Sequence, residues 1–96
     1  MQFIYKARYL KRFERFPRHH QLLILEADRQ IREFYQTRHA PVGLRIKVLH
    51  VRGGEQVFEA RASQSIRIVW AEREDIVSFL LVGLHDDVKR HLRSLR

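Results

Sequence analysis

The sequence predicts an α+β fold: an N-terminal strand and a two-helix hairpin packed on an antiparallel β-meander, followed by a short C-terminal helix. Three observations predict it. The chain has 96 residues, of which 45% are hydrophobic, a size that suits one domain with a thin core. Apolar residues recur at helical spacing up to residue 38 and alternate with polar residues from residue 44. The period changes at a breaker, Pro41-Val42-Gly43, and we treat residues 1–96 as a single domain.

The first half of the chain predicts a strand and two helices. Residues 3–5 are β-prone, and a basic segment then carries apolar residues at three-residue spacing, at Ala7, Leu10, Phe13 and Phe16. Pro17 ends this first helix, and residues 18–38 keep a helical period without Gly or Pro. The expected apolar stripe of the second helix is Leu23, Ala27, Ile31 and Phe34, with Ile24 and Tyr35 beside it. Its expected polar face is Glu26, Asp28, Arg29, Gln30, Arg32 and Glu33.

The second half of the chain predicts four strands and a helix. The strands are expected at residues 44–49, 56–62, 65–71 and 75–82, with tight connections between them. The last strand is apolar on both faces and should lie inside the sheet. Arg67, between Ile66 and Ile68, predicts one wetter face for its strand. Residues 85–95 form the cationic C-terminal helix, with Val88, Leu92 and Leu95 at helical spacing.

Composition limits the function classes. Nineteen Lys and Arg against eleven Asp and Glu give a formal charge of +8, and such a surface attracts nucleic acid or an acidic protein. The absence of Cys excludes a disulfide framework, a Cys-based zinc site and thiol catalysis. The chain is too small for an enclosed cofactor cavity, so no cofactor is expected. No apolar run approaches the ~18 residues of a membrane span, and the sequence predicts a cytoplasmic protein.

Candidate site residues lie on the strands. Arg61 and Arg67 fall on adjacent strands, and a cationic concavity able to hold a phosphodiester could join them to Lys47, His50 and Arg52. The same arginines also fit ordinary solvated strand positions paired with Glu59 or Asp75, and both interpretations stay open.

His85 stands where the last strand gives way to the helix. The acidic pair Asp86-Asp87 that follows it is also typical of any helix start. The six histidines of the chain show no ligand spacing, so no metal site is predicted.

Four segments carry a family resemblance in their order and spacing: residues 43–47 (Gly-Leu-Arg-Ile-Lys), 58–62 (Phe-Glu-Ala-Arg-Ala), 66–69 (Ile-Arg-Ile-Val) and 82–88 (Val-Gly-Leu-His-Asp-Asp-Val). The chain resembles, over essentially its whole length, the RelE/ParE superfamily of toxins from bacterial and archaeal type II toxin–antitoxin systems. The resemblance implies a RelE-like fold. For the RelE-like branch it implies ribosome-dependent cleavage of mRNA without a metal, by attack of a ribose 2′-hydroxyl on the adjacent phosphate.

The resemblance also implies roles for individual residues. Arg67 matches the arginine that stabilises transition-state charge, Arg61 a second phosphate contact, and His85 the general acid. Many RNA-cleaving members carry an aromatic residue where this chain has Lys89, so base selection is expected to differ. Lys47, His50, Arg52 and Lys89 are the expected substrate contacts. The general base is open between Lys47, His50 and Glu59.

Two other functions stay open on the same fold. One is a ParE-like inhibitor of DNA gyrase, and the other is a degenerate toxin that only binds. The expected partners are mRNA, the ribosome and a cognate antitoxin whose acidic segment covers Arg61, Arg67 and the C-terminal helix. No membrane or small-molecule cofactor is expected, and self-association stays open.

Overall fold

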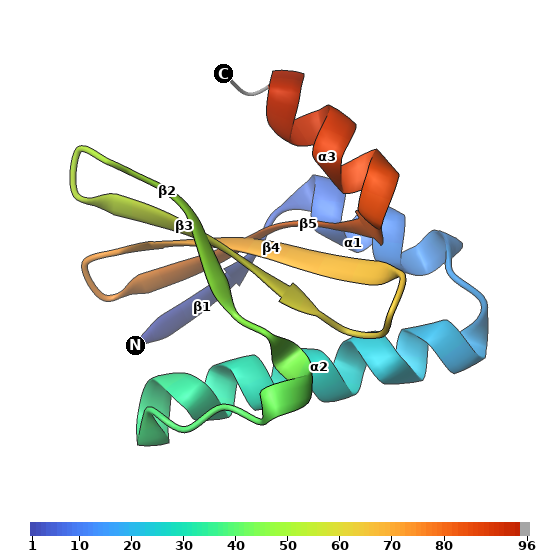
Figure 1. The fold of residues 1–96 in the computed structure, drawn as a ribbon, viewed down its shortest axis with the longest axis horizontal. Coiled ribbons are helices and arrows are strands. Elements are labelled where there is room, and N and C mark those ends of the chain that lie inside the picture. The colour runs from blue at the N-terminus through green and yellow to red at the C-terminus, as the bar shows by residue number, and fades with distance from the viewer. Residues whose placement is uncertain (95–96) are drawn as a thin grey trace.

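The computed structural model describes residues 1–94 and confirms the predicted α+β order (Figure 1). The elements are β1 (Gln2–Tyr5), α1 (Ala7–Arg15), α2 (Arg18–Thr37), a 3₁₀ turn η1 (Val42–Leu44), β2 (Lys47–Arg52), β3 (Glu55–Arg61), β4 (Ile66–Arg73), β5 (Ile76–Leu84) and α3 (His85–Ser94). Leu95, assigned above to the last helix, lies outside the described residues. Among residues 1–94, no helix is both long and apolar enough to cross a membrane.

The five strands form one sheet in the order β1-β5-β4-β3-β2. Strands β2 to β5 make the predicted antiparallel meander, and β1 pairs in parallel with β5. The apolar strand β5 therefore lies inside the sheet, between β1 and β4, as its sequence predicts.

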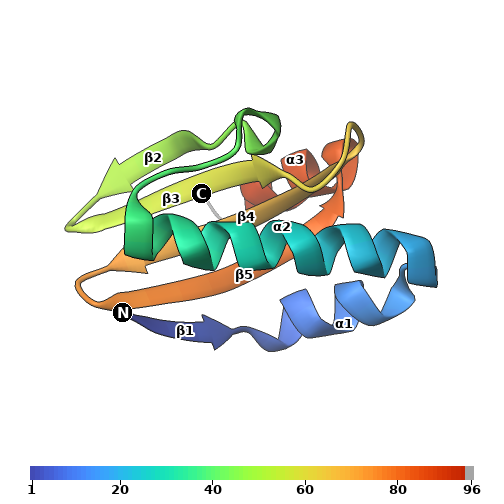
Figure 2. The same ribbon diagram turned by 90° about the horizontal axis from the view of Figure 1, so that it is seen from below.

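Helices cover both faces of this sheet. In Figure 1, α2 lies below the sheet and α3 stands on the opposite side. Figure 2 shows α1 beside β5 and antiparallel to α2, which confirms the helical hairpin. One face is thus covered by α1 and α2, and part of the other is covered by α3.

The larger core lies between the sheet and the helical hairpin. Trp70 and Phe79 are its largest fully buried side chains, and the Tyr5 ring stacks on Phe79 with centroids 4.8 Å apart. Trp70 Nε1 donates a hydrogen bond of 2.8 Å to the Tyr35 hydroxyl, which satisfies a buried indole N–H and ties α2 to β4.

The buried stripe of α2 is rotated from the predicted one. Leu23 is 43% exposed, and Phe34 is only half-buried. The residues of α2 that are buried are Ile24, Ala27, Asp28, Ile31 and Tyr35.

Asp28 was expected on the polar face of α2, and that expectation is wrong. Its carboxylate accepts hydrogen bonds from the Tyr5 hydroxyl at 2.7 and 2.9 Å, and Arg32 Nε lies 3.3 Å from Oδ1. These partners make burial of the charge tolerable. Burial, together with the hydrogen bond to Asp28, raises the pKa of Tyr5 above its usual range.

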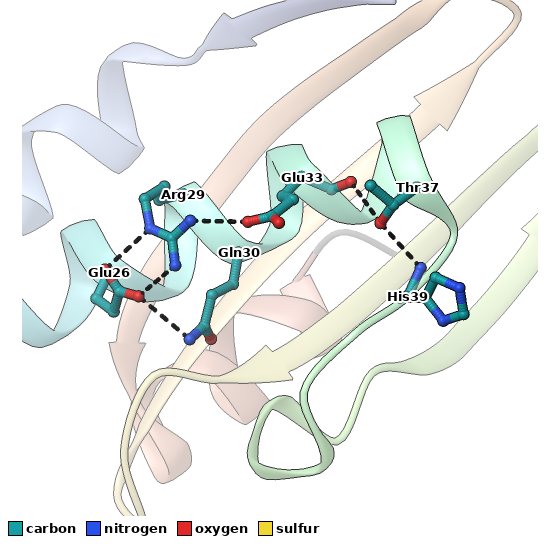
Figure 3. A network of polar contacts seen from close by, with 6 residues as sticks. All are labelled: Glu26, Arg29, Gln30, Glu33, Thr37 and His39. Atoms are coloured by element: carbon teal, nitrogen blue, oxygen red, sulfur yellow. Dashed lines mark hydrogen bonds and ion pairs between the residues drawn. The ribbon is translucent and has the colours of Figure 1, made fainter.

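The outer face of α2 neutralises its own charges (Figure 3). Arg29 lies between two carboxylates, with nitrogen–oxygen distances of 2.6 Å to Glu26 and 2.7 Å to Glu33. The hydrogen bonds from Arg29 lower the pKa of Glu26. The network continues through Gln30 to Glu26 and through Thr37 to the Glu33 carbonyl.

A second, smaller core docks α3 on the other face of the sheet. Val88 of α3 is buried against a cluster made of Val57, Val69, Ala71 and Leu81, with Leu49, Leu80 and Leu92 packed around it. From α1, Arg12 Nη2 lies 2.8 Å from His91 Nε2 and links the first helix to the last.

The start of β2 and the alternation within it differ from the prediction because of local backbone geometry. Leu44 is buried in η1, Arg45 follows with a left-handed φ of 47°, and β2 begins only at Lys47. A bulge between Val48 and His50 then interrupts the alternation in β2.

Candidate active site

An open cleft of about 330 Å³ lies where β2, β3 and β4 meet the start of α3. It is lined by Arg45, Ile46, Lys47, Glu59, Ala60, Arg61, Arg67 and His85. The cleft therefore gathers four of the seven predicted site residues, namely Lys47, Arg61, Arg67 and His85, together with the candidate base Glu59.

Strand register explains why these side chains meet. Arg61 stands opposite Arg67 in the β3–β4 ladder, and Lys47 stands opposite Glu59 in the β2–β3 ladder. Ala60 packs in the core under the helical hairpin, so its neighbours Glu59 and Arg61 point to the other face of the sheet. Alternation along the strands thus places several charged groups on one face.

Arg67 is buried, with 7% of its surface exposed. Its Nη1 donates to the carbonyl oxygens of Gln64 at 2.9 Å and Ser63 at 3.2 Å, in the β3–β4 turn. The prediction of a wetter face for β4 is wrong, because residues 66–71 are all buried and Val88 of α3 packs on Val69 and Ala71 of the face that was expected to meet water. The hydrogen bonds to the β3–β4 turn hold the Arg67 guanidinium in place.

The surroundings of Arg67 oppose its charge. Burial lowers the pKa of Arg67, Arg61 lowers it further, and Glu59 partly offsets both. Arginine still keeps its proton, because its ordinary pKa lies above ~12. Within residues 1–94, Nη2 of Arg67 donates no hydrogen bond to a protein acceptor. Its N–H groups are therefore left for a ligand or solvent.

The cleft holds more positive than negative groups. Glu59 is the one carboxylate among the residues lining it, is 6% exposed, and is shared by two cations. Lys47 Nζ lies 3.2 Å from Glu59 Oε2, and Arg67 Nε lies 3.9 Å from Oε1. Arg61 and Arg45 have no ion pair within the described part of the chain. Such a lining favours an anionic ligand.

His85 stands exposed at the rim of the cleft. Its backbone N–H donates a 2.9 Å hydrogen bond to the carbonyl of Ser65, which fixes the start of α3 against the β3–β4 turn. Since β5 ends at Leu84 and α3 begins at His85, no loop loosens this position.

Three predicted substrate contacts lie outside the cleft lining. His50 and Arg52 are exposed farther along β2, and Lys89 is exposed on α3. Of the candidate bases, Lys47 and Glu59 are therefore in the cleft and His50 is not. Arg45 lines the cleft and was missed as a site residue, because no glycine marks the left-handed backbone conformation that turns the chain there.

Comparison with known proteins identifies the fold. No family model and no curated protein matches the sequence. Solved structures do match: the archaeal RelE–RelB complex from Pyrococcus horikoshii aligns with a TM-score of 0.65 and 15% identity, over 86% of this chain and 92% of that chain. The chain has the RelE-like fold.

Two further structures share the RelE-like fold. YafQ in the Escherichia coli DinJ–YafQ toxin–antitoxin complex has a TM-score of 0.68 and 12% identity, over 91% of this chain and 94% of that chain. The YoeB/ParE toxin from Agrobacterium tumefaciens has a TM-score of 0.62 and 17% identity, over 88% and 99%. At such identities, the likeness establishes the fold and not the chemistry.

Proposed function

We propose that this protein is the toxin of a type II toxin–antitoxin pair and an endoribonuclease that cleaves mRNA on the ribosome without a metal. The observation that carries the proposal is the cleft, in which Arg61, Arg67 and His85 meet on a RelE-like fold. These are the residues to which the family resemblance gives phosphate contact, charge stabilisation and proton donation.

The proposed reaction is an internal transfer within the RNA. The ribose 2′-oxygen forms a bond to the adjacent phosphorus while the bond from phosphorus to the 5′-oxygen breaks. The products are a 2′,3′-cyclic phosphate and a 5′-hydroxyl. This reaction requires a base for the 2′-hydroxyl, cations for the charge on the phosphorane and an acid for the leaving oxygen.

Arg67 is suited to stabilise the phosphorane because its guanidinium is already oriented. Hydrogen bonds to Ser63 and Gln64 hold Nη1, so little reorganisation is needed when charge develops. Arg61, directly opposite on β3, supplies a second fork of donors for the phosphate oxygens.

His85 is assigned the general acid. Its imidazole is exposed, and histidine is the side chain that most often donates and accepts protons in catalysis. For the base we favour Glu59 over Lys47, because Lys47 is the cation of their 3.2 Å ion pair and the carboxylate can accept a proton directly.

Primer extension on cellular messages after induced expression tests the activity. New 5′ ends within translated messages are expected, together with growth arrest, and a folded Arg61→Ala protein should produce far fewer. Gyrase-dependent DNA breaks without RNA cleavage would replace the nuclease with a ParE-like inhibitor. If neither RNA cleavage nor DNA breaks are observed, the protein is a degenerate toxin that only binds.

The proposed partner is an antitoxin with an acidic segment. The matched RelE and YafQ structures are complexes with RelB and DinJ. An acidic chain that folds on binding could contact Arg61, Arg67 and α3 together and block access of RNA. Co-expression of the short open reading frame beside the gene should relieve growth arrest, and failure to relieve it would remove that pairing.

A further inference from the structure

A second cationic surface lies on α1, outside the cleft. Arg8, Lys11, Arg12 and Arg15 follow the spacing that places side chains on one side of a helix. These four residues alone line a hollow of about 220 Å³ on the described surface. We call this set of residues the α1 face.

The charge of the α1 face is almost unopposed. Glu14 is the one carboxylate in α1 and does not line the hollow. In the described part of the chain, this face makes one ion pair, in which Arg12 Nη1 lies 4.0 Å from Asp87 Oδ2. Arg8, Lys11 and Arg15 are exposed. Neighbouring like charges one turn apart cost stability, so folding does not favour this arrangement.

Packing of α1 does not require these cations either. The helix is held to the core by Tyr9, which is 3% exposed, and by Phe13 and Phe16 at its C-terminal end. The cationic and apolar sides of the helix are separate. The unopposed charge is therefore available for a ligand.

The α1 face reaches the same junction as the cleft. Arg12 and Arg15 also line a neighbouring hollow with Phe16, Gly83, Leu84 and Asp87. Leu84 directly precedes His85, which lines the cleft. Figure 2 shows α1 running beside β5 toward the end from which α3 departs. One extended polyanion, or two, could occupy both surfaces.

We infer that the α1 face binds the phosphate backbone of a structured RNA, separately from the strand in the cleft. The lining of the hollow is wholly cationic, which fits a row of phosphates. An acidic protein segment that folds on binding also needs apolar anchors, and no apolar side chain lines this hollow; Phe16 and Leu84 line only the neighbouring one, so a protein ligand is the alternative that the test must separate. The inference rests on the proposed function and deepens it, since a ribosome offers structured RNA beside the mRNA that would occupy the cleft.

A 2′-O-methyl RNA hairpin is the probe for this surface, because it has no 2′-hydroxyl and cannot be cleaved by the proposed reaction. Its binding to the full chain is measured by fluorescence anisotropy over a range of salt concentrations. The test variant is Lys11→Gln/Arg15→Gln, which leaves Arg12 and its contacts to α3 intact. Its control, Arg38→Gln/Arg73→Gln, removes the same charge from exposed sites directly after α2 and at the end of β4.

We expect the test variant to bind the hairpin about 10- to 100-fold more weakly near 0.1 M salt, with the slope of log Kd against log salt reduced by about 2. The control should stay within about threefold of the parent protein, because binding depends on where the charges lie. Equal losses in both variants, or no loss in either, would overturn the inference. Unchanged circular dichroism and thermal melting verify that both variants fold.

A polyglutamate peptide of equal charge tests the alternative ligand. If it binds more tightly than the hairpin and loses affinity in the Lys11→Gln/Arg15→Gln variant, the α1 face is a protein-binding surface and the inference is wrong. Cleavage of unmodified mRNA on ribosomes is measured separately. Hairpin binding at α1 without any cleavage would refute the proposed nuclease and support the inference. Cleavage without α1-dependent binding would support the nuclease and refute the inference.

Discussion

The outer face of α2 and the lining of the cleft both carry arginines, but their charges are arranged in opposite ways. On α2, Arg29 lies between Glu26 and Glu33 within 2.7 Å of each. In the cleft, Glu59 is the one carboxylate among the lining residues. It faces a group of cations that includes Arg61. Arg29 and Arg32 of α2 each have a carboxylate partner one turn away, whereas the cations that line the cleft outnumber its one carboxylate.

The net charge of +8 resides mainly outside α2. The α2 sequence holds three cations and three carboxylates, whereas α1 holds four cations and one carboxylate. Pairs such as those of α2 contribute little to the field at a distance. Excess charge is concentrated on the cleft and the α1 face, and these are the surfaces to which function is assigned.

The largest effect is expected for His85→Ala at the cleft. Loss of a general acid costs roughly 10² to 10⁴ in cleavage rate, and the exposed imidazole can be removed with little change in melting temperature. His39→Ala, which removes an exposed histidine after α2, is the matched control and should cleave normally. Full activity in a folded His85→Ala protein would exclude His85 from the mechanism.

Arg67→Lys comes next, because it keeps the charge but loses the planar fork. We expect a fall of roughly 10² in rate, since a donor aimed at the phosphorane is removed or displaced. Arg67→Ala should also reduce the free energy of unfolding by about 1–3 kcal/mol, because the carbonyls of Ser63 and Gln64 lose their donor. Denaturant unfolding separates the two effects, and an Arg67→Ala protein of unchanged stability would contradict the anchoring role.

How far the sequence could predict these features depends on the range of the interactions. Alternation and breakers are local, and they predict the meander and the pairing of Arg61 with Arg67. The second cover of β4 depends on α3 docking across the sheet, where Val88 packs on Val69 and Ala71, and the burial of Asp28 depends on Tyr5 from another element. Neither contact changes the spacing of apolar and polar residues along the chain, so the sequence pattern does not predict it. The bend at Arg45 could not be predicted from the sequence either, because the residue with the left-handed φ is not a glycine.

On its inner side, α2 holds one charge whose removal should be costly. Asp28→Ala takes the acceptor from the Tyr5 hydroxyl and the partner from Arg32. We expect a loss of about 2–3 kcal/mol in the free energy of unfolding and no loss of RNA cleavage. Chemical denaturation and a ribosome cleavage assay measure the two quantities. Reduced cleavage in the folded variant would show that the helical layer communicates with the cleft.

The three tyrosines, which pack in the core between the sheet and the helical hairpin, make stability depend on pH. Burial raises the pKa of all three, Tyr5, Tyr9 and Tyr35, above the usual value. The folded state thus holds protons that the unfolded state releases above pH ~10, so stability is complete below that pH and falls as pH rises beyond it. Absorbance at 295 nm should show phenolate formation in denaturant near pH 10 and a delayed rise in the native protein. Coincident titrations would contradict the burial of these phenols.

The smallest effect is expected for Arg29→Gln on the outer face of α2, and it is the sharpest test of the contrast. The exposed Arg29 pairs with Glu26 and Glu33, and such surface pairs contribute roughly 0–1 kcal/mol. Arg61→Gln removes the same unit of charge from the cleft. If unpaired charge directs RNA binding, Arg61→Gln should weaken it and Arg29→Gln should leave it unchanged, with similar melting temperatures for both. Equal losses of RNA affinity in the two variants would mean that total charge governs binding, and the division into paired and unpaired surfaces would no longer account for function.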